Sequence, residues 1–200
     1  MPIQIGAKPE SGFNDPLGLL SDCHRRIERF LAQIVRIVEA HRAAAESPSA
    51  LTADSSAALE AALQYFRTSG PLHTRDEEES LFPRLRLSES AAAHDALKTV
   101  DALEVDHDVA ESAHTTLDQI ATRWLTENTL PPDDATRLHD LTLTLQTLYA
   151  RHIAAEDTNV FPLAAQALSP TDLHKIGQEM AARRGVPFEA PAPLTRRSPR

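Results

Sequence analysis

Apolar residues recur at alternating steps of three and four along several long stretches of the chain, and this periodicity limits the fold more than any other feature. Between residues 16 and 46 the stripe consists of Leu17, Leu20, His24, Ile27, Leu31, Ile34, Val38 and His41. Residues at this spacing lie on one face of an α-helix, so the stretch predicts a helix that buries one side. Asp15 and Pro16 predict its start, because aspartate caps free backbone N–H groups and proline fits the first helical position.

The same pattern predicts three more long helices, at about 50–85, 89–127 and 132–168, and a short one from 169 to 184. Proline inside a helix costs about 3 kcal/mol, so Gly70-Pro71 predicts a kink or short break in the second of them. Four long amphipathic helices joined by short connections predict an all-α, up-down-up-down four-helix bundle.

The composition agrees with a single helical domain. The chain has 200 residues, of which 42% are apolar and only 4% aromatic. A chain of this length and composition favours one helical core over a β-sandwich. We expect a flexible segment at 1–14, the bundle at 15–168, a short C-terminal helix at 169–184 and a disordered Pro/Arg-rich tail at 185–200.

Charge and cysteine content exclude several classes of function. The net charge is −9 although residues 183–200 are basic, so the body of the protein is acidic and is not expected to bind nucleic acid. The single cysteine, Cys23, excludes an internal disulfide and a cysteine-based metal cluster within one chain. We find no signal-peptide pattern and no apolar run of about 18 residues, so we expect a soluble, cytoplasmic protein without membrane association.

Four histidines lie on the predicted inward faces of the helices, and each is followed by glutamate four residues later. The pairs are His24/Glu28, His73/Glu77, His107/Glu111 and His152/Glu156. Positions i and i+4 share one face of a helix, so each pair can offer an imidazole nitrogen and a carboxylate oxygen to one metal cluster.

The four histidines are also expected at one height in the bundle. With the first connection near residue 48, His24 lies 24 residues before it and His73 lies 25 after it. With the last connection near residue 130, His107 lies 23 residues before it and His152 lies 22 after it. The connection near residue 88 matches less well. Equal offsets place residues of antiparallel helices at equal height, which predicts a buried layer of four histidines.

Such a layer has two interpretations. The histidines either hydrogen-bond their i+4 glutamates within the core, or they bind metal; four pairs at matched heights favour metal, because unpaired buried polar groups are costly. Imidazole and carboxylate suit iron, zinc and manganese. Four histidines with two or more glutamates exceed the needs of one tetrahedral zinc ion, and two metals bridged by carboxylates use these donors better.

Two segments with a shared pattern, HTRDEEESLFP at 73–83 and HIAAEDTNVFP at 152–162, together with His24 and His107, resemble the hemerythrin HHE cation-binding domain. The resemblance covers about residues 15–168. It implies a di-iron centre, bridged by carboxylates and an oxo or hydroxo group. The terminal ligands would be His24, His73, His107 and His152, and the bridging carboxylates would be Glu77 and Glu156.

Glu111 departs from the oxygen-carrying members of that family, which have a second histidine at this position. Glu111 is therefore a further candidate ligand, a partner of a ligand, or a group that closes the site to oxygen. Glu28 is either a hydrogen-bond partner of a ligand histidine or a solvated residue. We expect Glu78 and Glu79 on a solvated face, His114 and Tyr149 in the core, and Cys23 turned about 100° away from His24.

Three functions fit this reading. The first is a protein that binds dioxygen, nitric oxide or a related small ligand at a di-iron centre, in sensing or stress response. The second is a di-iron enzyme, either a ferroxidase or an oxidoreductase that consumes peroxide or nitric oxide, and Glu111 as an extra anionic donor would favour it. Iron storage is the weakest, because no cage-forming signal is recognisable.

Overall fold

The structure, a computed structural model, describes residues 11–43 and 50–188, and all regular elements in these ranges are helical. The long helices are α1 (Pro16–Ala43), α2 (Ala53–Asp76), α4 (Ala91–Glu127) and α5 (Pro132–Ala155). The shorter elements are η1 (Glu77–Leu81), α3 (Phe82–Leu87), η2 (Glu156–Val160), α6 (Phe161–Ala167) and α7 (Pro170–Arg183). The predicted all-α class is confirmed. Most of the predicted flexible segment 1–14 and disordered tail 185–200 lies outside the described residues.

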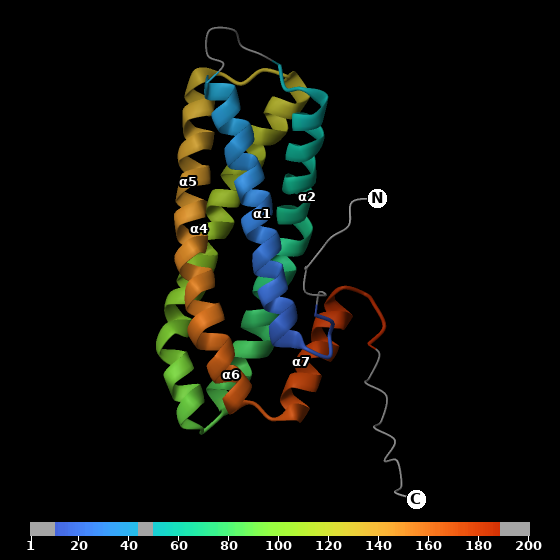
Figure 1. Ribbon diagram of the computed structural model, residues 1–200, viewed down its shortest axis with the longest axis vertical. Helices are drawn as coiled ribbons and strands as arrows, with labels where there is room; N and C mark the ends of the chain where they lie inside the picture. The colour runs from blue at the N-terminus through green and yellow to red at the C-terminus, as the bar shows by residue number, and fades with distance from the viewer. Residues whose placement is uncertain (1–10, 44–49, 189–200) are drawn as a thin grey trace, which may run out of the picture.

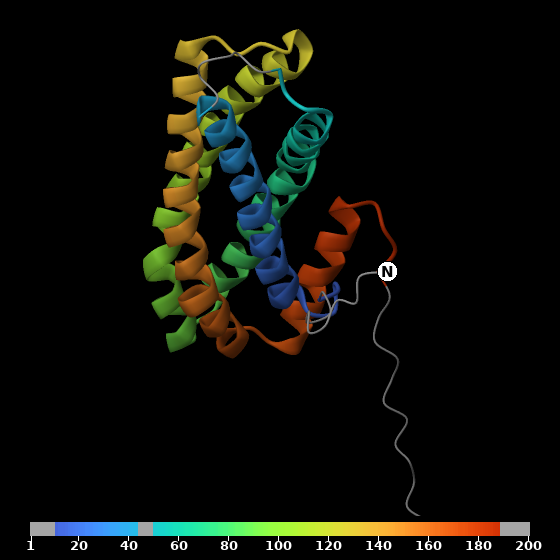
Figure 2. The same ribbon diagram turned by 45° about the horizontal axis from the view of Figure 1, so that its top comes forward.

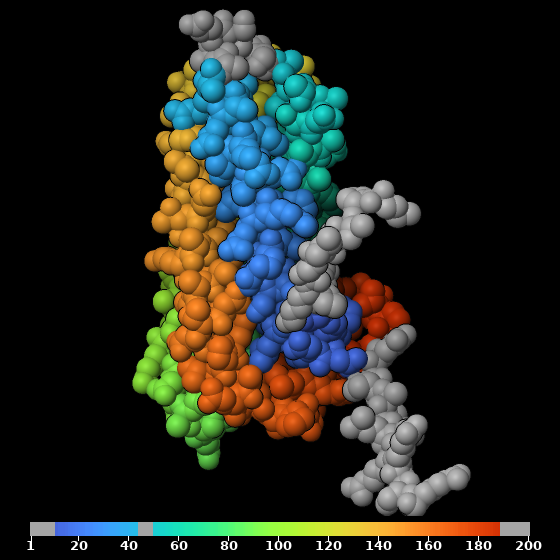
Figure 3. Space-filling model, in the orientation of Figure 1, coloured from blue at the N-terminus to red at the C-terminus, as the bar shows by residue number. Residues whose placement is uncertain are grey.

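The four long helices lie side by side along the long axis of the molecule (Figure 1). Helix α1 packs against α2 and α5, and α4 also packs against α2 and α5. The colours in Figures 1 and 2 show that successive long helices run in opposite directions, with α7 beside the lower ends of α1 and α2. The face formed by α1 and α5 is closed by side chains (Figure 3). Among the described residues, no helix is both long and apolar enough to cross a membrane.

Side-chain caps define the ends of several helices. The hydroxyl of Thr52 accepts the N–H of Ser55 at the start of α2, and the hydroxyl of Ser90 accepts the N–H of Ala93 at the start of α4. Ser169 and Asp172 form a reciprocal capping box at the start of α7. Each cap satisfies backbone N–H groups that have no partner within the helix, so these polar residues set where the helices begin.

Of the two outcomes predicted at Gly70-Pro71, the short break is wrong, because α2 continues as an α-helix from Ala53 to Asp76, and the kink stays a prediction. Pro71 is exposed, so its ring displaces no core side chain. The loss of one backbone hydrogen bond at this surface position is outweighed by the packing of α2 against α1 and α4.

The irregularities lie instead in two π-helical turns, η1 and η2, each of which begins at a buried glutamate. The N–H of Phe82 bonds to the carbonyl of Glu77, and the N–H of Phe161 bonds to the carbonyl of Glu156. A proline follows each phenylalanine. A proline clashes with the carbonyl four residues before it and cannot donate to it, and the wider turn accommodates both effects. The shared Phe-Pro sequence therefore marks these turns.

The apolar core has two main parts, and a polar layer separates them along α1 and α4. One part includes Ile34 of α1 and Trp124 of α4, and the other includes Leu20 of α1 and Val100 of α4. His24 and His107 lie between these core residues in the sequence of their helices, and His73 and His152 occupy the corresponding places on α2 and α5. The core thus holds a layer of histidines at one level.

Candidate metal centre

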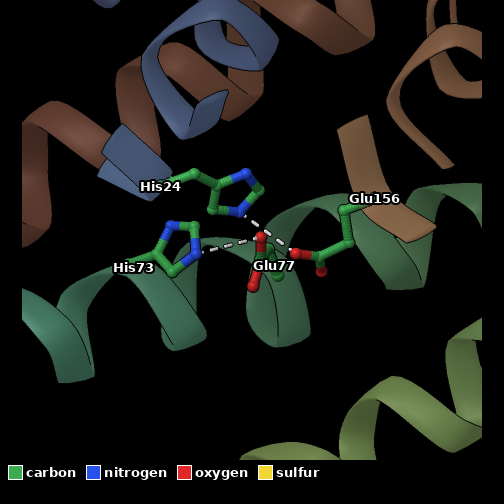
Figure 4. Close-up of side chains that lie close together, drawn as sticks. All are labelled: His24, His73, Glu77 and Glu156. Atoms are coloured by element: carbon green, nitrogen blue, oxygen red, sulfur yellow. Dashed lines mark ion pairs between the residues drawn. The ribbon is translucent and has the colours of Figure 1, made fainter. Parts of the chain in front are cut away.

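Six of the seven candidate ligands come together in this layer. His24 lies on α1, His73 on α2, His107 on α4 and His152 on α5, while Glu77 and Glu156 are the first residues of the two π turns. All six side chains are buried. Figure 4 shows His24 and His73 turned with their ring nitrogens toward the carboxylates of Glu156 and Glu77.

The six residues form two groups that share the glutamates. In each group the donor atoms lie within 4.8 Å of one another, and the groups consist of His24, His73, Glu77 and Glu156, and of His107, His152, Glu77 and Glu156. Because both carboxylates belong to both groups, the arrangement has two adjacent four-donor positions with two shared carboxylates.

The distances between donor atoms fit first-row metal ions. His24 Nε2 and His152 Nε2 lie 3.1 and 3.2 Å from Glu156 Oε2. His73 Nε2 and His107 Nε2 lie 3.4 Å from Glu77 Oε1 and Oε2. Donors about 2.0–2.2 Å from one ion lie roughly 3 Å apart when they bind it at right angles. The separations therefore suit donors that surround an ion.

The hydrogen bonding of the two glutamates supports the same conclusion. The four carboxylate oxygens of Glu77 and Glu156 are buried, and ring nitrogens of the four histidines are their near polar neighbours. Two carboxylates buried side by side are unfavourable without positive charge to offset them, whereas carboxylate oxygens are good ligands for iron, manganese and zinc. The donor set therefore fits metal ions better than it fits a core without metal.

Carboxylates also face the outward Nδ1 atoms of three of the histidines. His24 Nδ1 lies 3.0 Å from Asp157 Oδ1, and His107 Nδ1 lies 2.8 Å from Glu78 Oε1. His152 Nδ1 faces Asp106 at 3.5 Å. A carboxylate that accepts the Nδ1 proton leaves the Nε2 lone pair free for a metal and holds the ring in orientation.

The electrostatics of the metal-free cluster are asymmetric. Burial disfavours a charged His24 ring, but the hydrogen bond with Asp157 and the nearby Glu156 carboxylate outweigh burial and raise the pKa of His24 to about 9. Burial, together with the charge of Glu156, raises the pKa of Glu77 well above its usual value. Burial would also raise the pKa of Glu156, but His152 and His24 lower it below its usual value. Without metal, a proton on His24 offsets the charge of Glu156, and a proton on Glu77 leaves that carboxyl group neutral.

The remaining candidates lie elsewhere. Glu111 belongs to neither group; its side chain is exposed and lines a cavity between α2 and α4. Glu28 is half exposed and faces Arg25 at 3.8 Å rather than a ligand histidine. Cys23 is buried beside Arg26 and outside the donor groups, and burial raises the pKa of its thiol. His114 and Tyr149 hydrogen-bond each other at 3.0 Å and line the same cavity.

Sequence reasoning missed the three carboxylates that face Nδ1 atoms. The expectation that Glu78 is only a solvated residue is wrong, because it binds His107. The sequence did contain an indication of two of these contacts, because Glu78 and Asp157 directly follow Glu77 and Glu156 in the paired segments. The side chains of Glu78 and Asp157 extend from the edge of the inward face to a neighbouring helix, where they meet His107 and His24.

Sequence reasoning also missed the role of α7. Arg183 Nη1 and Arg184 Nη2 pair with the two oxygens of buried Asp76 at 2.8 and 2.7 Å, and Arg183 Nη2 donates to Ser80 at 2.6 Å. Asp76 and Ser80 lie on either side of Glu77 along the chain. Helix α7 therefore holds the π turn that carries one of the shared glutamates.

Comparison with known proteins agrees with this geometry. The hemerythrin HHE cation-binding domain matches residues 15–164. The chain is also similar to an uncharacterized protein of Haemophilus influenzae, with 28% identity over 174 residues that cover 87% of this chain and 92% of that protein. The match to the domain includes all six buried donors and ends before α7.

Proposed function

The chain belongs to the hemerythrin HHE cation-binding domain family, and on this premise we propose that it is a non-haem di-iron protein that binds dioxygen, nitric oxide or a related small ligand. The proposal includes the fold, in which α1, α2 with α3, α4 and α5 with α6 form the up-down-up-down four-helix bundle of that family. It also includes iron as the metal and a stoichiometry of two ions per chain.

The observation that carries the proposal is the sharing of Glu77 and Glu156 between two histidine pairs. One ion bound in either group would leave the histidine pair of the other group without a metal. Two ions would use all six donors, and each would receive two neutral imidazoles and an oxygen from each glutamate.

The side chains of this protein have three tasks in such a centre. Glu77 and Glu156 would bridge the two metal positions, and the four histidines would complete each position through Nε2. Asp157 and Glu78 hold the rings of His24 and His107 through Nδ1. Iron would supply an open coordination position and electrons for the small ligand. The apolar core above and below the layer covers the donors along the bundle axis.

Metal analysis of purified variants tests the assignment. His73→Ala and Glu156→Ala each remove a buried donor, so both should lower the iron content well below that of the wild type. His94→Ala is the control, because His94 is exposed and far along α4 from the donor groups. Equal iron content in all three variants would contradict the assignment, provided that circular dichroism shows each to be folded.

A second function, a di-iron oxidoreductase that consumes peroxide or nitric oxide, is favoured by the carboxylates at Nδ1. A carboxylate partner raises the basicity of a histidine ligand, and this stabilises oxidised iron over the reduced state that reversible oxygen binding needs. Turnover of hydrogen peroxide by the iron-loaded protein, lost in Glu156→Ala, would support this function. A stable oxygen adduct without turnover would favour the first.

A further inference from the structure

The cavity between α2 and α4 extends from the surface to the histidine layer. Its volume is about 560 Å³, and its lining includes His24, His73, His107 and His152. The space is far larger than a diatomic ligand needs, since one water molecule occupies about 30 Å³ of the liquid. Pockets of roughly 300–1,000 Å³ are typical of sites for organic molecules.

Part of the cavity wall is apolar, and the basic side chains that line the cavity lie at its mouth. Ile27, Leu63 and Leu117 are buried lining residues. Arg67 and Arg75 lie at the exposed edge and are paired with Asp118 and Glu79 at 2.6 and 2.8 Å. The acidic lining residues Glu78, Asp108 and Glu111 disfavour an anion, and any charged molecule would lose hydration against the apolar part of the wall. The wall therefore suits a neutral molecule.

One part of the wall is aromatic and carries a fixed polar group. The rings of Phe66 and His114 stack with their centroids 4.2 Å apart, and His114 Nε2 lies 3.0 Å from the hydroxyl of Tyr149. The ring of Tyr149 lies 6.4 Å from that of His152, so this pair borders the proposed metal centre. Flat aromatic surfaces favour ring-shaped ligands, and a hydroxyl orients one polar atom of such a ligand.

Gly70 keeps the α2 side of the cavity open. It lies inside a helix, where glycine costs about 1 kcal/mol relative to alanine. A Cβ atom added there would meet only Phe66 Cδ1, at 3.8 Å, which is an ordinary contact. Gly70 does not have a positive φ. Neither packing nor backbone conformation requires glycine at this position, but any larger side chain would occupy part of the cavity that Gly70 lines.

We propose that this cavity binds a neutral organic molecule of one or two aromatic rings with a single hydroxyl, such as a phenol or naphthol, next to the metal centre. The inference rests on the proposed function for the role of the ligand, which would be a co-substrate or effector of that centre. The binding itself depends on the Phe66, His114 and Tyr149 wall and on the space at Gly70.

Calorimetric titration with 2-naphthol tests the proposal, with the metal content of each sample measured in parallel. The wild type should bind one equivalent. Gly70→Leu should weaken binding at least tenfold by filling the space, whereas Gly70→Ala adds only the Cβ atom and should bind like the wild type. Tyr149→Phe should weaken 2-naphthol binding by roughly three- to tenfold, the effect of one hydrogen bond, and should not weaken the binding of naphthalene.

The outcomes separate this inference from the proposed function. Full metal content without 2-naphthol binding would overturn the cavity proposal and leave the metal centre intact. Binding that Gly70→Leu does not weaken would place the ligand elsewhere and also overturn it. Tighter binding of 2-naphthoate than of 2-naphthol would refute the neutral class. Binding of 2-naphthol to a protein that takes up no metal would support the cavity while contradicting the metal centre.

Discussion

The ion pairs between α7 and Asp76 give a prediction about stability that can be worked out from the structure. Asp76 is fully buried, and its oxygens pair with Arg183, the last residue of α7, and with Arg184, which follows it. Replacing both arginines with alanine leaves a buried carboxylate without a counter-charge. Breaking a buried pair in this way costs about 3–5 kcal/mol.

This loss should be visible in thermal unfolding. For a chain of about 200 residues, 1 kcal/mol shifts Tm by roughly 2–4 °C, so Arg183→Ala/Arg184→Ala should lower Tm by roughly 6–20 °C. Arg86→Ala is the matched control, because Arg86 also pairs with two carboxylates, Asp101 and Glu104, but is 41% exposed. An exposed pair is worth about 1 kcal/mol or less, and its loss should shift Tm by only a few degrees.

A third substitution identifies the cause. If the unpaired charge is what destabilises the double variant, then adding Asp76→Asn should recover part of the lost Tm, because an uncharged amide costs less to bury than a carboxylate. All Tm values should be measured on metal-free protein, so that changes in metal binding do not contribute. No recovery in the triple variant, or equal losses in the Arg183/Arg184 and Arg86 variants, would refute the reasoning.

Four further predictions concern the metal centre and its surroundings. Asp157→Asn should weaken metal binding by about 10- to 100-fold in a chelator competition titration, while Glu28→Gln, an exposed change on α1, should leave it unchanged. Metal uptake at neutral pH should release protons from His24 and Glu77, because the pKa values of both groups are raised. The affinity for metal should therefore increase with pH up to about 9. Calorimetry in buffers of different ionisation enthalpy measures the proton release, and a pH-independent affinity would contradict the prediction. The same raised His24 pKa stabilises the metal-free protein below about pH 6.5, and this contribution should disappear as the pH rises through about 9, which pH-dependent Tm values check. Cys23 should react slowly with thiol reagents in the folded protein and quickly after denaturation, since burial raises its pKa; rapid labelling of the folded protein would show that the thiol is accessible.

The positions of the helices could be predicted from the sequence because each helix buries one face. Steps of three and four residues gave the range 89–127 for the helix that the structure has at Ala91–Glu127. The same steps placed His24, His73, His107 and His152 on inward faces, and equal distances from the connections placed them at one height. Both inferences need only the regular rise and turn of an α-helix.

Local departures from the regular helix could not be predicted in the same way. The π turns at Glu77 and Glu156 depend on a proline six residues later, and the expected break at Pro71 did not occur because packing along the whole helix outweighs one lost hydrogen bond. The i+4 spacing alone also could not show that Glu77 joins the donor groups whereas Glu28 and Glu111 do not. The rotation of each helix about its axis decides which glutamate turns inward.

Contacts between distant parts of the chain were the hardest to predict. Asp157 binds His24 across 133 positions of sequence, and Arg183 binds Asp76 across 107. Neither helical periodicity nor composition indicates such a pair, because both describe one helix at a time. The three-dimensional packing of α1 on α5, and of α7 on α2, brings these residues together.

The most direct test of the account is the metal content of protein purified from iron-supplemented cells, measured together with its ultraviolet–visible spectrum. The shared Glu77 and Glu156 carboxylates predict about two iron ions per chain, as in other di-iron carboxylate bundles, with absorption from an oxo or hydroxo bridge in the near ultraviolet. A protein without metal, or with one zinc ion per chain, would contradict the two-ion centre.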